Sequence, residues 1–240
     1  MADRVFAPGP ITAGRATLTG DEARHLARVR RLGPGDAVEL LDGRGGAWLA
    51  VVDRVERDRV ELAVGEPLPE RPDGPHLTLA TAVPKGERFD WLVEKATELG
   101  VARLVPILAS RSTVDPRSSK LDRLRRLVVE ACKQSGRRRL MEIGPTTPWP
   151  DACRSESPGA RFLAHPGGMP AASAIAGAPA GPLALAIGPE GGFDPDEVAG
   201  AVAAGWRLID LGPNLLRIET AALAGAASVL AIARSKGEPS

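Results

Sequence analysis

The sequence predicts an α/β protein of two domains, a small β-barrel followed by a larger domain with a largely parallel sheet. Residues 66–76 contain four prolines and one glycine, which cannot continue a helix or a central strand, so a domain boundary is expected there. Short strand-like runs separated by turn signals precede this boundary, which is typical of a small barrel. Strands that alternate with helical patterns follow it, which is typical of a parallel sheet covered by helices.

The first domain is expected to consist of short strands with one helical interruption at residues 21–32. The segment Asp-Gly-Arg-Gly-Gly at residues 42–46 separates two of the strands and is typical of a hairpin loop. The predicted strands are residues 16–18, 37–41, 47–52 and 60–64.

The second domain begins with a buried strand and continues in alternation with helices. Asp194-Pro195 followed by Glu197 is a good helix start, with an acidic N-cap, proline in the first turn and glutamate three residues after the cap. Residues 144–182 are rich in Pro, Gly and Ala and, apart from one short strand, predict no definite structure. The predicted strands are residues 77–83, 104–108, 161–164, 183–187 and 208–211, and the other predicted helices are residues 87–99, 121–134 and 219–233.

Two glycine- and proline-bearing loops follow strands near the C-terminus. The first is Ile-Gly-Pro-Glu-Gly-Gly-Phe at residues 187–193, and the second is Leu-Gly-Pro-Asn-Leu-Leu-Arg-Ile-Glu-Thr-Ala at residues 211–221. Each precedes a helical pattern, so both should lie at the sheet edge where open α/β folds bind ligands. Glycine lets backbone N–H groups approach a ligand closely.

Each loop also has a simpler interpretation. The first fits a tight strand-to-helix turn about as well as a ligand site. A phosphate site is disfavoured, because no Gly-Lys-Ser/Thr follows and Glu190 suits a cationic or hydroxyl-bearing ligand. The second could be a crossover in which Arg217 and Glu219 satisfy each other, with Asn214, the chain's one asparagine, as a left-handed turn residue.

The bulk composition excludes several classes of protein. The formal net charge is +1, so any affinity for nucleic acid must come from local patches. No apolar run is evident that is long enough for a membrane span, and residues 1–6 lack the pattern of a secretory signal. Cys132 and Cys153 form no CxxC pair, and are expected to be free thiols in the cytosol. The three histidines, His25, His76 and His165, lack zinc-ligand spacing, so no metal site is expected.

Five further motifs follow one another along the chain: residues 20–32 with Gly35-Asp36 and Asp42-Gly43, residues 85–100, Arg111-Ser112, residues 130–137, and His165-Pro166. Together with the two loops described above, they resemble the 16S rRNA (uracil-N3)-methyltransferase family, the E family of ribosomal RNA small-subunit methyltransferases, in the SPOUT class. The resemblance runs nearly end to end, although family members often carry a basic residue where this chain has Asn214.

The resemblance implies a PUA-like RNA-binding β-barrel at residues 1–70. It also implies a SPOUT-type knotted α/β methyltransferase domain at residues 74–240, with a C-terminal trefoil knot, acting as a cytoplasmic homodimer without metal. It implies S-adenosylmethionine as cofactor and 16S rRNA of the small (30S) ribosomal subunit as substrate. The implied cofactor-binding residues are His165, Pro166, Ile187, Gly188, Pro189, Glu190, Gly191, Gly192, Leu211, Gly212, Leu216 and Thr220.

Methylation of uracil N3 requires removal of the imide proton and stabilisation of charge on the flanking carbonyl oxygens. In this interpretation Arg217 stabilises that charge, and Glu219 either orients Arg217 or acts as a base. A water molecule could also accept the proton.

Basic residues are the candidates for RNA contact, because phosphate contacts give affinity with little sequence information. A helix over residues 21–32 would place Arg24, Arg28 and Arg31 on one face and turn Leu26 and Val29 toward the barrel. For a lone run of charges, a solvated face is the favoured interpretation, but further arginines elsewhere in this near-neutral chain strengthen the case for RNA contact. The RNA-binding candidates are Arg24, Arg28, Arg30, Arg31, Arg111 and Arg137, the last beside Arg138 and Arg139.

Two other functions remain open from the sequence. One is a different SPOUT RNA methyltransferase, acting on a ribose 2′-hydroxyl or on tRNA. The other is a non-catalytic RNA-binding assembly factor, which the intact loops at residues 188–192 and 216–220 disfavour.

Overall fold

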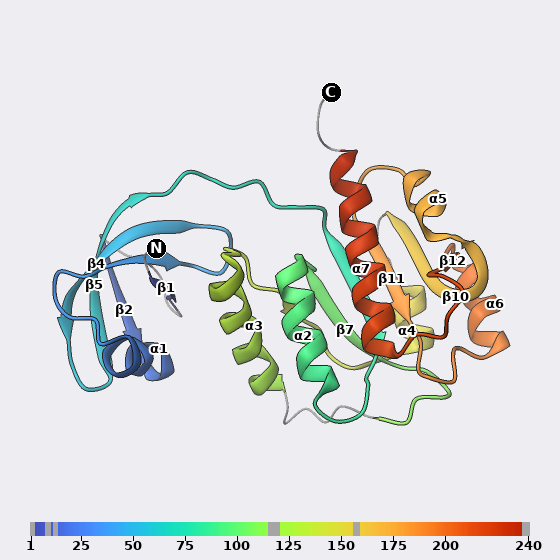
Figure 1. The fold of residues 1–240 in the computed structure, drawn as a ribbon, viewed down its shortest axis with the longest axis horizontal. Helices are drawn as coiled ribbons and strands as arrows, with labels where there is room; N and C mark the ends of the chain where they lie inside the picture. Colours follow the sequence, from blue (N-terminus) through green and yellow to red (C-terminus); the bar gives the residue numbers. More distant parts are fainter. Residues whose placement is uncertain (1–2, 8–10, 12–13, 115–120, 156–158, 237–240) are drawn as a thin grey trace. The chain divides into compact units, whose positions relative to one another are not determined.

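The computed structural model describes residues 3–7, 11, 14–114, 121–155 and 159–236. The chain divides into two compact units (Figure 1). The first comprises residues 1–73 and 132–140, and the second comprises residues 74–131 and 141–240. A return of the chain to the first unit at residues 132–140 was not predicted from the sequence.

The first unit is built on a five-stranded sheet with the order β1-β3-β4-β5-β2. Alternate residues of these strands, such as Val38, Leu40, Val60 and Leu62, are buried in one shared core, as expected when one sheet face is covered. The predicted hairpin is confirmed, since Leu41 pairs with Ala47 across the turn. The strands are β1 (Asp3–Phe6), β2 (Arg15–Thr19), β3 (Ala37–Leu41), β4 (Ala47–Val55) and β5 (Arg59–Pro67).

The predicted helix at residues 21–32 is two short helices of different kinds. Helix α1 (Gly20–Arg24) continues into a π-helix, η1 (His25–Arg30). A π-helix bonds residue i to i+5 and so has more residues per turn than an α-helix. Leu26 is 2% exposed whereas Val29 is 66% exposed, so the prediction that Val29 faces the barrel is wrong.

Residues 132–140 make partly buried ion pairs with the rest of the first unit. They include the end of helix α3 (Leu121–Ser135). The ammonium of Lys133 pairs with the carboxylate of Glu22, and Arg138 lies 3.6 Å from Glu39. Arg138 also donates to the Pro69 carbonyl at 2.6 Å and is 8% exposed. Its guanidinium therefore stabilises this unit and is not free for RNA.

The second unit contains a seven-stranded sheet with the order β12-β10-β11-β6-β7-β8, and β9 also pairs with β7. Every described pairing in it is parallel, so the predicted parallel sheet is confirmed. The trefoil knot stays a prediction. The strands are β6 (Leu77–Ala82), β7 (Arg103–Leu108), β8 (Glu142–Ile143), β9 (Thr147–Pro148), β10 (Ala160–Pro170), β11 (Leu183–Ile187) and β12 (Arg207–Asp210).

Helices cover both faces of this sheet. On one face lie α2 (Arg88–Leu99), α5 (Ala171–Ala176) and α7 (Ile218–Ser235) (Figure 1). On the other face, α4 (Trp149–Arg154) and α6 (Pro195–Ala203) enclose a core that contains Trp149, Phe193 and Trp206. The helix start predicted at Asp194 is confirmed, because its side chain and that of Glu197 form a capping box.

Helix α7 alone among the described helices is long and apolar enough to cross a membrane, a pattern that was not expected from the sequence. However, 44% of the helix is buried inside the protein. It packs against β6 and β11 through buried residues such as Ala222, Ala226 and Val229. A helix that packs inside a domain has this same apolar composition, and α7 is such a helix.

Candidate functional site

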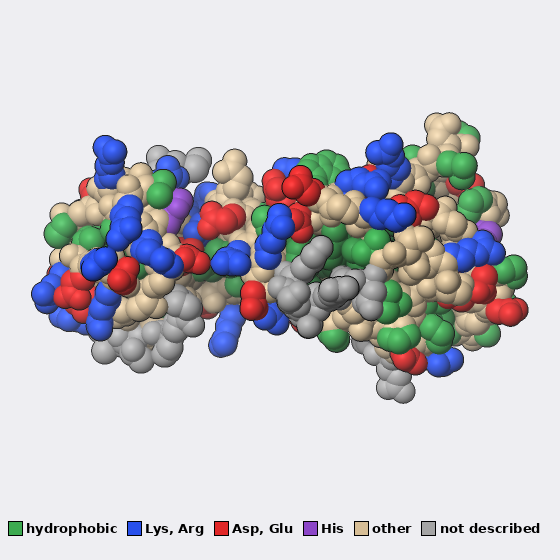
Figure 2. Space-filling view, turned by 90° about the horizontal axis from the view of Figure 1, so that it is seen from below, with side chains coloured by type: hydrophobic (Ala, Val, Ile, Leu, Met, Phe, Trp, Pro, Cys, Tyr) green, Lys and Arg blue, Asp and Glu red, His purple; other side chains and the backbone are tan. Residues whose placement is uncertain are grey.

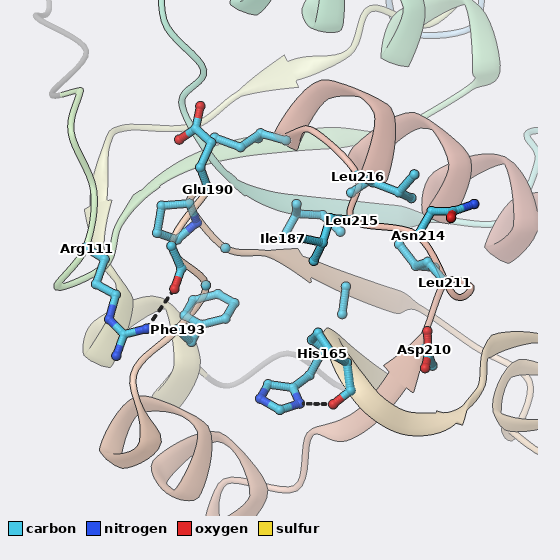
Figure 3. Close-up of a pocket in the computed structure, with 18 of the residues that line it drawn as sticks. Arg111, His165, Ile187, Glu190, Phe193, Asp210, Leu211, Asn214, Leu215 and Leu216 are labelled. Carbon is cyan, nitrogen blue, oxygen red and sulfur yellow. Dashed lines mark hydrogen bonds between the residues drawn. The ribbon is translucent and has the colours of Figure 1, made fainter.

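The candidate site is a pocket where three neighbouring parallel strands end (Figure 3). Strands β12, β10 and β11 are adjacent in the sheet, and the segments that follow or interrupt them line the pocket. The cavity has a volume of about 380 Å³, which lies within the range of roughly 300–1,000 Å³ typical of small-molecule sites. The carboxyl edge of the parallel sheet, where the two glycine loops were expected to meet, therefore carries a ligand-sized pocket.

An excursion within strand β10 forms one wall. Ala164 pairs with Ile209 of β12, and Met169 pairs with Ile209 again after the excursion, so His165 and Pro166 leave the ladder and line the pocket. The carboxylate of Asp210 fixes this wall, because it accepts from Gly167 N at 3.3 Å and from Gly212 N at 2.8 Å. One carboxylate thus joins the β10 wall to the loop after β12.

The loop after β11 forms the second wall. Gly192 N donates to the Pro189 carbonyl at 2.8 Å, and Gly192 has a φ of 70°, which favours glycine. A Cβ at Gly188 would lie 2.9 Å from the ring of Phe193. The segment is therefore a tight turn that also lines the pocket, and its role in binding a ligand stays a prediction.

The loop after β12 forms the third wall and exposes apolar side chains. Leu215 is 96% exposed and Leu216 is 38% exposed. The left-handed turn predicted at Asn214 is wrong, because Arg31 is the one described non-glycine residue with positive φ; in this loop Gly212 has a φ of 127°. Glycine adopts that conformation without a steric penalty, so asparagine is not needed for it.

The pocket brings together all but one of the residues predicted to bind cofactor. Thr220 lies in α7 and does not line the cavity. Lining the cavity are His165, Pro166, Ile187, Gly188, Pro189, Glu190, Gly191, Gly192, Leu211, Gly212 and Leu216.

The two predicted catalytic residues do not line the pocket. Arg217 is exposed and is the N-cap residue of α7. Glu219 is 6% exposed, its Oε1 lies 3.5 Å from the Arg88 guanidinium, and its Oε2 has no hydrogen-bond partner. The described partner of Glu219 is therefore Arg88 of α2 and not Arg217.

Arg111, which was predicted to contact RNA, lines the pocket. Its guanidinium donates to the Gly191 carbonyl at 2.7 Å (Figure 3). The preceding residue is also fixed, because the Ser110 hydroxyl donates to Asp194 at 2.6 Å. That hydrogen bond lowers the pKa of Asp194 below its ordinary value. Arg111 lies shortly after the end of β7, and this place near a strand end was the sequence signal for a position in the pocket wall.

The other predicted RNA-binding residues lie in the first unit. Exposed basic and acidic side chains are interspersed on this unit (Figure 2). Arg24 pairs with Asp21 and Arg30 pairs with Asp3. Arg28 and Arg31 are exposed and have no ion pair within the part of the chain that the structure describes.

Arg137 differs from these exposed arginines. It is half-buried, and burial lowers the pKa of its guanidinium from the ordinary value. The described residues also contain no cluster of His, Cys, Asp or Glu that could hold a metal ion. Cys132 and Cys153 are buried and form no disulfide.

Comparisons with known proteins indicate RNA methyltransferases for both parts of the chain. A family model described as "RNA methyltransferase domain" matches residues 71–230, and one described as "RNA methyltransferase PUA domain" matches residues 18–64. Ribosomal RNA small subunit methyltransferase E of Synechocystis sp. is 34% identical over 96% of this chain and 78% of the relative. The protein of that name from Mycobacterium bovis is 35% identical over 92% of this chain and 88% of the relative.

A solved structure gives the same result for the fold. The crystal structure of Ribosomal RNA small subunit methyltransferase E from Neisseria gonorrhoeae, bound to S-adenosyl methionine, matches with a TM-score of 0.88 at 27% identity. The match covers 97% of this chain and 98% of that one. The chain therefore consists of a PUA-like first domain and an α/β methyltransferase domain with a parallel sheet. The chain belongs to the ribosomal RNA small subunit methyltransferase E family and is an RNA methyltransferase.

Proposed function

We propose that the protein methylates N3 of a uracil in 16S rRNA of the small ribosomal subunit, with S-adenosylmethionine as methyl donor. The observation that carries this proposal is the pocket where β10, β11 and β12 end, built from the loops predicted to bind that cofactor. Relatives that match nearly the whole chain are named for methylation of small-subunit ribosomal RNA, and one such protein is solved with the cofactor bound.

The pocket fits this cofactor in size and in chemistry. Its volume of about 380 Å³ suits a molecule of that size. Ile187, Leu211 and Leu216 offer apolar surface for a nucleoside, and the glycines of residues 188–192 bring backbone close to a ligand. When bound, S-adenosylmethionine supplies a methyl group carried on a sulfonium.

Arg217 is the proposed electrostatic stabiliser of the uracil. It directly follows Leu216, which lines the pocket, and it is exposed where a substrate base could reach it. A guanidinium there would stabilise the negative charge that spreads over the carbonyl oxygens when the N3 proton leaves. Glu219 is buried and pairs with Arg88, so it suits a positioning role that holds the first turn of α7 and is less suited to act as the base.

The first unit is the proposed RNA-binding part, with exposed Arg28 and Arg31 as phosphate contacts.

We further propose that the protein acts in the cytoplasm as a homodimer and without a metal. The exposed apolar side chains of Leu215 and Leu216, which line the pocket, support a subunit contact. Light scattering on the purified protein would test the dimer, and a monomer at all concentrations would contradict it.

The experiment that tests the function is transfer of a labelled methyl group to purified 30S subunits, followed by nucleoside mass spectrometry. Appearance of 3-methyluridine in 16S rRNA is expected. A labelled ribose, or methylation of tRNA alone, would contradict the proposed substrate.

Calorimetry without RNA separates cofactor binding from methyl transfer. The variant Gly191→Leu, which fills a pocket wall, should abolish cofactor binding. A wild-type protein that binds no cofactor would contradict the enzyme activity.

The same assay tests Arg217. Arg217→Ala should bind cofactor normally and lower the single-turnover rate by about a hundredfold, the size of effect known for removal of one charge-stabilising donor. Arg207→Ala, an exposed arginine on β12, is the matched control and should keep its rate. An Arg217→Ala variant that methylates at the wild-type rate would remove Arg217 from the mechanism.

A further inference from the structure

We propose that the start of helix α2 receives the RNA strand beside the target uridine, with Lys85 and Arg88 on its phosphates and Trp91 stacked on a neighbouring base. This inference rests on the proposed function and deepens it, because it assigns an RNA surface to the methyltransferase domain itself. It also gives a role to the motif at residues 85–100, which lines no part of the pocket.

The chemistry of the target atom requires an unpaired base. N3 of uracil lies on the Watson–Crick edge, so in a paired uridine its proton is already donated to the opposite base. An enzyme that modifies such an atom acts on a single strand or extrudes the base from its stack. Extrusion leaves the neighbouring base without a stacking partner, and aromatic side chains take that place in proteins that bind single-stranded RNA. The domain that holds the pocket should therefore offer cations to a strand and an aromatic surface to a base.

The start of α2 lies at the sheet edge that carries the pocket. Strand β6 is the neighbour of β11, and the loop that joins β6 to α2 leaves the carboxyl end of β6. Arg88 lies 3.5 Å from Glu219 in the first turn of α7, two residues after Arg217. In Figure 1 both helices begin at the lower end of the second unit, and Figure 2, which views the molecule from below, shows Lys and Arg side chains close together on that unit.

Two cations at the start of α2 have donors available for a phosphate. Lys85 is exposed, and its ammonium has no ion pair in the part of the chain that the structure describes. Arg88 donates from Nε to the Lys85 carbonyl at 3.1 Å and from Nη1 to Glu219 at 3.5 Å, and its side chain is 38% exposed. No described contact uses Nη2 of Arg88. Because a guanidinium has five N–H donors, Arg88 is held in place and still has donors for a phosphate.

The carboxylates of α2 itself already have partners. The ion pairs are Asp90 with Arg123, Glu94 with Lys95, and Glu98 with Lys95. Glu87, just before the helix, is exposed. Glu87 and Glu219 are thus two carboxylates against the three cations Lys85, Arg88 and Arg217, so the surface keeps a positive charge that suits a phosphate strand.

Trp91 supplies the aromatic surface. It is 48% exposed, whereas Trp149 and Trp206 of the same unit are 1% and 5% exposed. Helix α2 packs into the domain through other residues, such as the fully buried Leu92, so the core does not account for Trp91. Trp91 lies three residues after Arg88, which makes the two side chains neighbours on the helix surface, about 4.5 Å apart along the axis. A base on Trp91 and a phosphate at Arg88 can therefore belong to one short stretch of strand.

Filter binding of purified 16S rRNA tests this surface without cofactor or methyl transfer. Trp91→Ala should weaken binding about tenfold at every salt concentration, which is within the loss expected for one stacked base. Trp91→Phe, which keeps an aromatic ring, should retain most of the affinity. Val202→Ala is the matched control, because Val202 is an exposed apolar residue on α6, and it should bind RNA as the wild type does.

The cations have a different signature in the same assay. Lys85→Ala should reduce the slope of log K against log salt by about 0.7, the value for one phosphate contact on a single strand. Arg88→Gln, which keeps an amide donor near Glu219, should do the same, and Trp91→Ala should leave the slope unchanged. Arg207→Ala is the matched control for these charges.

Unchanged affinity in Trp91→Ala together with an unchanged slope in Lys85→Ala would overturn the inference. Weaker binding of S-adenosylhomocysteine by Trp91→Ala, measured by calorimetry, would also overturn it, because the variant would then disturb the domain itself. Unchanged RNA affinity with an altered mass in light scattering would assign Trp91 to a contact with a second copy of the chain. A wild type whose RNA binding depends on these residues but which produces no 3-methyluridine would refute the proposed function and leave the RNA surface standing.

Discussion

At the scale of single residues, ion pairing separates the basic side chains of the first unit into two groups. Arg24 and Arg30 already contact the carboxylates of Asp21 and Asp3. Arg28 and Arg31 are exposed and have no described ion pair. A phosphate gains most from a cation that does not first have to leave a carboxylate, so the second group should dominate RNA binding.

The double variant Arg28→Ala/Arg31→Ala should therefore bind ribosomal RNA more weakly and with less dependence on salt. Each lost phosphate contact lowers the slope of log K against log salt by about 0.9 on a duplex, so a change of about two is expected. Filter binding at several salt concentrations measures it. The double variant Arg24→Ala/Arg30→Ala is the matched control, and an equal change in both would contradict the distinction.

The sequence identified individual pocket residues well where a motif is contiguous in the chain. The residues of the loop after β11 line the pocket because a strand end and its glycines determine their place locally. Arg111 and Arg88 were not predicted to take the contacts they make, because their partners Gly191 and Glu219 are distant in sequence. Tertiary packing, which no local pattern reports, decides such pairs.

At the scale of elements, the wall formed by β10 depends on close approach of two backbones. A Cβ at Gly168 would lie 2.7 Å from the backbone nitrogen of Ile209 in β12. Backbone atoms of a paired strand cannot move aside as a side chain can. The excursion that places His165 and Pro166 in the pocket therefore requires glycine at this position.

Gly168→Ala should separate β10 from β12, lower the free energy of unfolding by about 1–3 kcal/mol, the usual cost of overpacking, and weaken cofactor binding. Gly200→Ala in α6 is the matched control, because nothing lies within 4 Å of its Cβ position. That variant should be neutral or stabilised by up to about 1 kcal/mol. Urea unfolding and calorimetry measure both effects, and a Gly168→Ala protein with unchanged stability would refute the argument.

Most elements could be predicted from hydrophobic periodicity and turn residues. Strands β3 and β11 have the predicted bounds, since each is a short apolar run between turn signals. The π-helix at His25–Arg30 could not be predicted, because its residues also fit an ordinary amphipathic α-helix. Helices α4 and α5 lie in the segment that gave no pattern, being too short for a helical period to show.

At the scale of the whole molecule, the chain order does not follow the units. A boundary near residue 70 could be predicted from its prolines. The return of residues 132–140 to the first unit could not, because it depends on ion pairs between residues far apart in sequence. Arg138, 8% exposed, contacts Glu39 at 3.6 Å and the Pro69 carbonyl at 2.6 Å.

If this return segment stabilises the first unit, removal of the Arg138 side chain should loosen that unit specifically. Arg138→Ala leaves the Pro69 carbonyl without its donor and Glu39 with Arg4 alone, which should cost about 2–3 kcal/mol. Arg139→Ala is the matched control, because Arg139 pairs with Asp73 on the surface and its loss should lower the free energy of unfolding by less than about 1 kcal/mol.

Hydrogen exchange measured by mass spectrometry resolves the two units. Faster exchange in β3 and β4 for Arg138→Ala, with the strands β6 and β11 unchanged, is expected. Equal acceleration in both units would mean that residues 132–140 stabilise the chain as one cooperative body, and no acceleration would mean that the first unit is stable without them.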